Sequence, residues 1–179
     1  MNYYDRLQHL AVVDAQDKIT GKVEKWEAHR RGVLHRAFTL GLIYQGHYVL
    51  QHRKHPAFNG YLDLTISSHP LYRENGVQTD REAIYETLKR EWFVQSADCV
   101  TDLKLLGKFY YRATDARSRL TEHEWNHVYT VELKSLPLPN YDYAYGHSLV
   151  SKEELYDRTH PIGQILTPWT IEALKLKMI

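Results

Sequence analysis

Hydrophobic and polar positions along the chain form a pattern that predicts strands first, with helices interspersed. The turn-prone segment Asp14–Gly21 closes the first apolar run, and Gln45–His47 separates two apolar runs as the turn of a hairpin does. Residues 62–66 alternate between apolar and polar, which is typical of a half-buried strand. The pattern therefore predicts strands at residues 10–13, 37–44, 48–51, 62–66, 103–113 and 125–133.

Helices are predicted where capping residues precede apolar residues at helical spacing. Thr79 and Glu82 have the spacing of a capping box, and the apolar residues after them predict an amphipathic helix over about 80–92. The same capping logic opens a second helix at Ser151, and Pro168 opens a third near the C-terminus. Mixed strands with roughly three helices indicate an α+β fold, which we expect to form one domain over residues 1–179.

Composition excludes several function classes. The 179 residues are 43% hydrophobic, which is enough for a single core, and the net charge of +1 disfavours nucleic acid as a partner. The sequence contains no run of about 18 apolar residues, so no membrane-spanning helix is predicted. The beginning of the chain lacks the charged-then-apolar pattern of a secretory signal. We expect a cytoplasmic protein that is a monomer or a weak homodimer.

Two further features have plain structural interpretations. The single cysteine, Cys99, has no partner for a disulfide and no basic neighbour in sequence, so we expect it to be buried and structural. Tyrosines concentrate at Tyr141–His147 after a proline-rich break. We expect a packed surface loop there, with a lid or a dimer contact as the functional alternatives.

Histidine, at 11 copies, is the unusual feature of the composition. His29 and His35 flank a Lys/Arg-rich turn, His69 lies at a strand-to-loop junction, and Glu122 and Glu124 project to one face of an extended segment. Three imidazoles and two carboxylates would form an octahedral set suited to Mg²⁺, Mn²⁺ or Zn²⁺. Most single histidines are surface or hydrogen-bonded residues rather than metal ligands. The spacing alone therefore does not decide between a metal site and these plain structural roles.

An ordered series of motifs resembles the type 1 isopentenyl-diphosphate isomerases, which are relatives of the Nudix hydrolases. The matching segments occur in the family's order along most of the chain: Glu24–His29, Leu34–Phe38, Ser68–Pro70, Tyr111–Asp115, Glu122–Glu124 and Pro168–Trp169. The resemblance implies a Nudix-like mixed β-sheet sandwiched by α-helices. It also implies that five residues bind one buried divalent ion, namely His29, His35, His69, Glu122 and Glu124.

That family converts isopentenyl diphosphate to dimethylallyl diphosphate by protonating an alkene and removing a proton elsewhere. The resemblance assigns Glu124 as the metal-bound acid or base with Tyr111 beside it, and Trp169 as the aromatic face for a carbocation. It assigns the diphosphate to the cationic side chains of Lys25 and Arg53. It also assigns a second Mg²⁺, delivered with the prenyl diphosphate substrate, to Glu91.

The chain departs from the family at the second catalytic residue. Ser67 stands where the family has a cysteine, and an alcohol gives up a proton far less readily than a thiol. Thr87 stands where relatives commonly have an arginine, which weakens the expected diphosphate site.

These departures leave two alternatives to an active isomerase. The first is a catalytically impaired homologue that still binds a diphosphate. The second is a Nudix-type pyrophosphohydrolase, which is disfavoured because only Glu91 remains of the required glutamate cluster and Phe93 occupies the glycine position.

Overall fold

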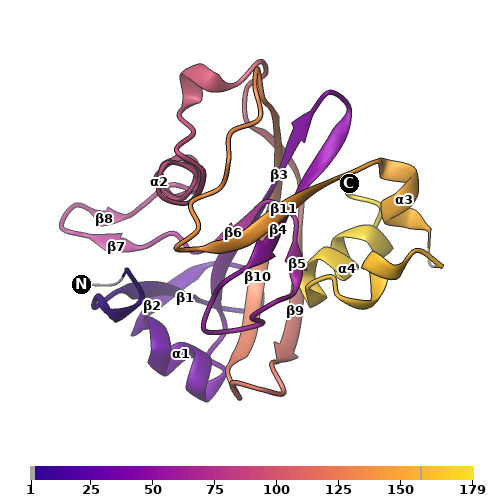
Figure 1. The fold of residues 1–179 in the computed structure, drawn as a ribbon. Coiled ribbons are helices and arrows are strands. Elements are labelled where there is room, and N and C mark those ends of the chain that lie inside the picture. The colour runs from indigo at the N-terminus through magenta and orange to yellow at the C-terminus, as the bar shows by residue number, and fades with distance from the viewer. Residues whose placement is uncertain (1–2, 158) are drawn as a thin grey trace.

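The computed structural model describes residues 3–157 and 159–179 and contains a nine-stranded sheet with four α-helices (Figure 1). The large sheet comprises β1 His9–Val13, β2 Ile19–Glu24, β3 His35–Tyr44, β4 His47–Arg53, β5 Leu62–Asp63, β6 Ile66–Ser68, β9 Lys104–Thr114, β10 Thr121–Glu132 and β11 Ala144–Val150. A small separate hairpin comprises β7 Tyr72–Arg73 and β8 Gly76–Val77. The helices are α1 Lys25–Arg31, α2 Asp80–Trp92, α3 Lys152–Tyr156 and α4 Pro168–Lys175, with 3₁₀ turns at Tyr3–Asp5, Ser96–Asp98 and Pro161–Gln164.

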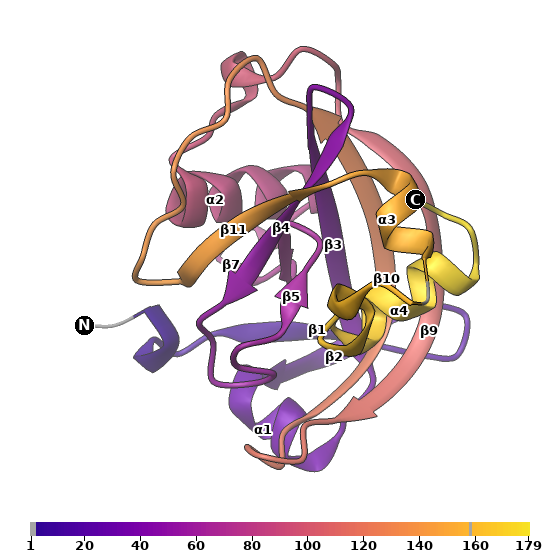
Figure 2. The ribbon, with the colours of Figure 1, turned by 45° about the vertical axis from the view of Figure 1, so that its right-hand side comes forward.

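Helices cover both faces of the sheet, as predicted. Figure 2 shows α2 on one side of β3 and β10, and α3 with α4 on the other. The α2 side buries Phe38, Ile84 and Trp92, whereas the α4 side buries Val128 and Trp169. β3 pairs in parallel with β10, and the remaining pairs in the large sheet are antiparallel. The α+β class and the sandwiched mixed sheet are confirmed.

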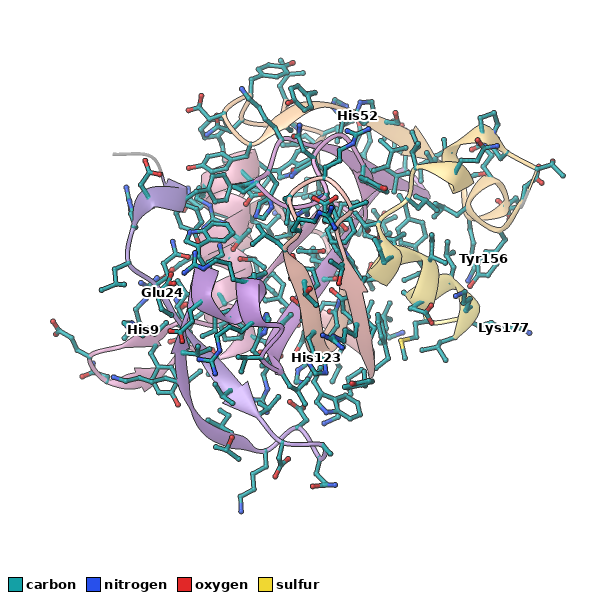
Figure 3. The ribbon with its side chains drawn as sticks, turned by 90° about the horizontal axis from the view of Figure 1, so that it is seen from below. His9, Glu24, His52, His123, Tyr156 and Lys177 are labelled. Atoms are coloured by element: carbon teal, nitrogen blue, oxygen red, sulfur yellow. The ribbon has the colours of Figure 1, made fainter. Side chains whose placement is uncertain are left out.

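Local capping signals located three of the helices well. Thr79 caps α2 with a complete capping box to Glu82, and Ser151 caps α3 in the same way. Pro168 is the first residue of α4. The C-terminal residues dock where α3 lies, because the Tyr156 hydroxyl donates to Ile179 O at 2.7 Å; Figure 3 shows Tyr156 and Lys177 on this side of the molecule. Among the described residues, no helix is long and apolar enough to cross a membrane.

The single half-buried strand predicted over residues 62–66 is wrong. The segment pairs first with β4 as β5 and then with β3 as β6, and all five residues are buried. At the crossover, the Thr65 hydroxyl donates to Val49 O at 2.6 Å and accepts from Leu42 N at 2.8 Å. The threonine side chain thus satisfies backbone groups of β3 and β4 where the two strands diverge.

Two other segments also differ from the prediction. Helix α1, which the pattern did not predict, runs into the Lys/Arg-rich turn between His29 and His35. Glu24 caps the helix by accepting from Trp26 N and Glu27 N, and Gly32 ends it at φ 63°. Seven residues are too few to show a clear helical period. The expected loop Tyr141–His147 becomes strand from Ala144 onward, because β11 pairs with the exposed edge of β4. Cys99 is buried, as expected.

Candidate metal centre and adjoining cavity

Helix α1 and the start of β3 orient two imidazoles toward the same point. His29 lies in the last turn of α1, with its Nδ1 2.6 Å from Lys25 O. His35 is the first residue of β3, with its Nδ1 2.7 Å from Val33 O. A carbonyl accepts only, so each Nδ1 carries the proton and each Nε2 keeps its lone pair for a ligand.

Strand β10 supplies the two carboxylates. Because side chains alternate along a strand, Glu122 and Glu124 both point inward, while the intervening His123 lies on the other face near Gly32 O (His123 is labelled in Figure 3). The parallel pairing places Glu124 directly beside His35. His69, immediately after β6, brings its Nε2 to 2.9 Å from Glu124 Oε1.

All five residues offer ligand atoms within 4.8 Å of one another, and all five are buried. In an octahedral site with metal–ligand distances near 2.1 Å, neighbouring ligand atoms lie about 3.0 Å apart and opposite ones about 4.2 Å apart. The observed separations agree: His29 Nε2 is 2.9 Å from Glu122 Oε2, and His35 Nε2 is 3.2 Å from His69 Nε2.

Orphaned polar atoms also indicate that this group suits a divalent cation. Within the described part of the chain, His29 Nε2, Glu122 Oε2 and His69 Nδ1 are buried and make no hydrogen bond. Leaving such atoms unpaired in a protein interior is costly. A cation among the three imidazoles and two carboxylates would satisfy the first two atoms and offset the negative charge. The donor set therefore fits a divalent ion.

The electrostatics keep Glu124 anionic and Tyr111 protonated. Burial raises the pKa of Glu124, but its contacts with the His35 imidazole and the Tyr111 hydroxyl outweigh burial and leave the pKa below its usual value. Burial, followed by the negative charge of Glu124, raises the pKa of Tyr111 well above its usual value. The phenol donates a 2.5 Å hydrogen bond to Glu124 Oε2, so a proton donor lies in direct contact with this carboxylate.

A cavity of about 20 Å³, enough for roughly one water molecule, lies next to this group. Of the eleven residues that the sequence singled out, all except His29 and His35 line it. Those two lie behind it and are completely buried. The lining residues from the prediction are Lys25, Arg53, Ser67, His69, Glu91, Tyr111, Glu122, Glu124 and Trp169.

Cationic side chains form one wall of the cavity. Burial, followed by repulsion from Arg90, lowers the pKa of Lys25 to about 8. Arg53 is buried beside Asp63, with 2.6 Å between Nη1 and Oδ2. Arg90 was not predicted; its Nη2 donates to Glu91 Oε1 at 2.8 Å and to Thr87 Oγ1 at 3.3 Å. An arginine thus reaches the vicinity of Thr87 from one turn further along α2.

Aromatic residues from the N-terminal 3₁₀ turn also line the cavity, and no sequence signal marked them. The Tyr3 ring lies 3.8 Å from the Arg90 guanidinium carbon, and the Tyr4 ring contacts His55 with centroids 4.8 Å apart. Lys25 Nζ lies 5.3 Å and 5.6 Å from the centroids of the Tyr3 and Tyr4 rings. Residues far apart in the sequence therefore meet around the cationic wall.

Asp63 is another residue that the sequence analysis missed. It is completely buried and accepts hydrogen bonds from Arg53, Ser67 and Trp169, all of which were singled out. The alternating pattern of residues 62–66 made this aspartate look like a solvent-facing position. An aspartate in a strand can be recognised as buried only when the cationic residue that pairs with it is known.

Comparison with solved structures identifies the fold. A crystal structure of a Deinococcus radiodurans protein matches with a TM-score of 0.68 at 18% identity, covering 94% of this chain and 98% of that one. The Nudix domain of Shewanella oneidensis NrtR, solved with ADP ribose, matches with a TM-score of 0.51 at 12% identity, covering 80% and 84%. The chain therefore has the Nudix fold, here with a buried group of three histidines and two glutamates.

Sequence comparison identifies the family, although no family model matches the chain. Isopentenyl-diphosphate Delta-isomerase 2 of Aromatoleum aromaticum is 32% identical over 148 residues, which cover 80% of this chain and 72% of the relative. The isopentenyl-diphosphate Delta-isomerase of Photobacterium profundum is 29% identical over 176 residues, covering 94% and 93%. The chain belongs to the isopentenyl-diphosphate Delta-isomerase family and is an isomerase-like enzyme.

Proposed function

We propose that this chain catalyses the metal-dependent isomerisation of isopentenyl diphosphate to dimethylallyl diphosphate, or the same shift in a close prenyl diphosphate. The observation that carries the proposal is the environment of Glu124. This carboxylate contacts two imidazoles and a phenol, and it lines the same cavity as Trp169 and Ser67. Metal ligands, a proton donor and an aromatic face therefore adjoin one small cavity.

Glu124 and Tyr111 are the proposed acid pair. Protonating an unactivated alkene requires a proton held close to carbon in a water-poor site. The Tyr111 hydroxyl is the nearest proton source to the Glu124 carboxylate, and both side chains are buried. In the proposed cycle, the proton that adds to the alkene passes from the Tyr111 hydroxyl through the Glu124 carboxylate, which is anionic before the step and again after it.

Trp169 is the proposed stabiliser of the positive charge that develops on carbon. Its indole is 2% exposed, and its Nε1 donates to Asp63 Oδ1 at 2.7 Å, which fixes the ring plane. Tyr111 packs near it with ring centroids 6.0 Å apart. A desolvated cation over such a face gains on the order of 2 kcal/mol.

The diphosphate is assigned to the cationic wall formed by Lys25, Arg53 and Arg90. Lys25 is 3% exposed and, within the described residues, has no carboxylate at ion-pairing distance, so its charge is available to an anion. Glu91 lies at the same wall. We assign it to the second Mg²⁺ that accompanies the substrate.

The buried divalent ion would be held by His29, His35, His69, Glu122 and Glu124, with Mg²⁺, Mn²⁺ and Zn²⁺ as candidates. When bound, it supplies positive charge that tunes the acidity of Glu124 and neutralises the paired carboxylates. The protein residues do the remaining work of orienting the alkene, excluding water and moving the proton.

Hydrolysis of a diphosphate is disfavoured by the arrangement of α2. Glu86, one turn and a half before Glu91, pairs with Arg73 at the surface at 2.7 Å rather than facing the cavity. Among the acidic residues of α2, only Glu91 lines the cavity. The side of α2 that faces the cavity, all of which the structure describes, therefore lacks the cluster of carboxylates needed to bind several Mg²⁺ ions.

Glu124→Gln tests the proposal. The amide cannot act as an acid or as an anionic ligand, so we expect turnover of isopentenyl diphosphate to fall by at least 10³-fold, roughly the contribution of a general acid. Binding of inorganic diphosphate, measured by calorimetry, should change little because the cationic wall is intact. Glu132→Gln, at the far end of the same strand, is the matched control and should keep full turnover. Full turnover by Glu124→Gln would refute the assignment.

A further inference from the structure

Three residues of the proposed site are joined through one buried carboxylate. Asp63 Oδ2 accepts from Arg53 Nη1 at 2.6 Å, while Oδ1 accepts from Trp169 Nε1 at 2.7 Å and from Ser67 Oγ at 3.1 Å. Asp63 itself is 0% exposed. The indole nitrogen donates only, and the guanidinium is always charged, so the partners of Asp63 are those of an ionised carboxylate.

This contact determines the direction of a buried hydrogen-bond chain. An ionised carboxylate only accepts hydrogen bonds, so Ser67 must donate its hydroxyl proton to Asp63. The Ser67 oxygen lies 2.9 Å from Thr39 Oγ1, which must therefore donate to Ser67. Thr39 in turn accepts from Asn126 Nδ2 at 2.9 Å. The protons all point from Asn126 toward Asp63.

The chain leaves the Ser67 oxygen in a defined state. Its proton points to Asp63, one lone pair accepts from Thr39, and its second lone pair is left for the cavity that Ser67 lines. Donation to an anion also increases the negative charge on the serine oxygen, because hydrogen bonds in a chain polarise one another. An alcohol in this setting presents an electron-rich acceptor to the substrate.

We propose that Asp63 is a positioning residue that orients the hydroxyl of Ser67, so that the serine oxygen faces the reacting carbon as a proton acceptor. The inference rests on the proposed isomerisation and deepens it. In the step assigned to this pair, one C–H bond of the substrate cation breaks and its electron pair forms the alkene. The proton passes to Ser67 Oγ as the hydroxyl proton of Ser67 passes to Asp63 Oδ1. After the product leaves, Asp63 returns its proton to Ser67 Oγ as Ser67 releases one proton to water in the emptied cavity, which restores both groups.

If Asp63 had a purely structural role, Asp63→Asn would have the same effect whatever residue occupied position 67. Arg53 and Trp169 would lose their partner in either case. A thiol ionises several units more readily than an alcohol and depends less on a carboxylate partner. The loss of kcat on Asp63→Asn should therefore depend on whether residue 67 is serine or cysteine. A structural effect should be the same in both backgrounds.

The first experiment is a double-mutant cycle on isopentenyl diphosphate. We expect Asp63→Asn to lower kcat by at least 100-fold in the native background and by less than about tenfold in the Ser67→Cys background. KM should rise by the same factor in both, because Arg53 is disturbed equally. Thr39→Val, which breaks the other end of the chain without exposing a buried charge, should lower kcat with KM unchanged. Equal kcat factors in the two backgrounds would overturn the inference.

A second experiment needs no turnover and separates this inference from the proposed function. In Ser67→Cys combined with Cys99→Ala, the single thiol is titrated by its ultraviolet thiolate absorbance, with the metal content held constant. Adding Asp63→Asn should lower the thiol pKa by at least one unit, a tenfold change in ionisation, because the adjacent negative charge is removed. Adding Asp115→Asn, at a buried aspartate that hydrogen-bonds Phe58 N and Ser118, should leave it unchanged.

An unchanged thiol pKa on Asp63→Asn would overturn the inference even in an active isomerase. A shifted thiol pKa in a protein that does not isomerise isopentenyl diphosphate would support the Asp63–Ser67 contact while refuting the proposed reaction.

Discussion

Removing the divalent ion from the buried histidine–glutamate group should measurably destabilise the fold. The perturbation is chelation, followed by return of Mg²⁺, Mn²⁺ or Zn²⁺. Without a cation, Glu122 and Glu124 lie close together as buried anions, and His29 Nε2 has no hydrogen-bond partner. A cation that binds only the folded chain stabilises it by mass action.

The size of the effect follows from linkage. At a free ion concentration 100-fold above Kd, the folded state gains about 2.7 kcal/mol. An unfolding entropy of about 2.1 cal/mol/K per residue over 179 residues amounts to about 0.38 kcal/mol/K. The expected rise in Tm is therefore about 7 °C.

Differential scanning calorimetry on the chelated protein, with each ion added back, measures this shift. His35→Gln removes a ligand that is completely buried and should abolish most of the rise. His47→Gln, at the exposed start of β4, is the matched control and should retain it. The reasoning is refuted if none of the three ions raises Tm, or if His35→Gln responds as strongly as the unaltered protein.

Two further predictions concern pH. Burial lowers the pKa of His127, but hydrogen bonds to Asp80 and Asp17 outweigh it and leave the pKa raised, whereas the pKa of each carboxyl is lowered. The ion-pair cluster of His127, Asp80 and Asp17 should stabilise the fold most between about pH 4 and 6.5. Its stabilisation is lost as pH rises through the raised pKa of His127, or as pH falls through the lowered pKa values of the two aspartates. His127→Gln should cost about 2–3 kcal/mol at pH 6 in urea denaturation and flatten this profile; an unchanged profile would contradict the account. Separately, KM for the diphosphate substrate should rise above about pH 8 as Lys25 loses its proton, and Lys25→Arg should extend low KM to higher pH.

Elements with complete local signals were predictable from the sequence. The capping box at Thr79 defines the start of α2 because both of its reciprocal hydrogen bonds form within four residues. The spacing of Glu122 and Glu124 predicts a shared face because strand side chains alternate, and both side chains point inward. In each case the information lies within a short segment.

Features that depend on distant partners were not predictable in this way. Asp63 sits in an alternating segment and is buried only because Arg53, Trp169 and Ser67 converge on it from other elements. Arg90 reaches the cavity because Tyr3, far away in sequence, packs on its guanidinium. Helix α1 is too short for its period to be read, although it carries His29. Burial of a charge depends on tertiary contacts, which local patterns do not encode.

Proton NMR of isopentenyl diphosphate in D₂O with the purified chain, Mg²⁺ and Mn²⁺ tests the central claim most directly. The account predicts that dimethylallyl diphosphate appears with deuterium incorporated from solvent, because the added proton comes from side-chain groups that exchange with solvent. Release of phosphate without dimethylallyl diphosphate would instead indicate a hydrolase. An unchanged spectrum over hours, from protein whose Tm responds to the metal, would contradict the proposed isomerisation and leave a homologue that binds without turnover.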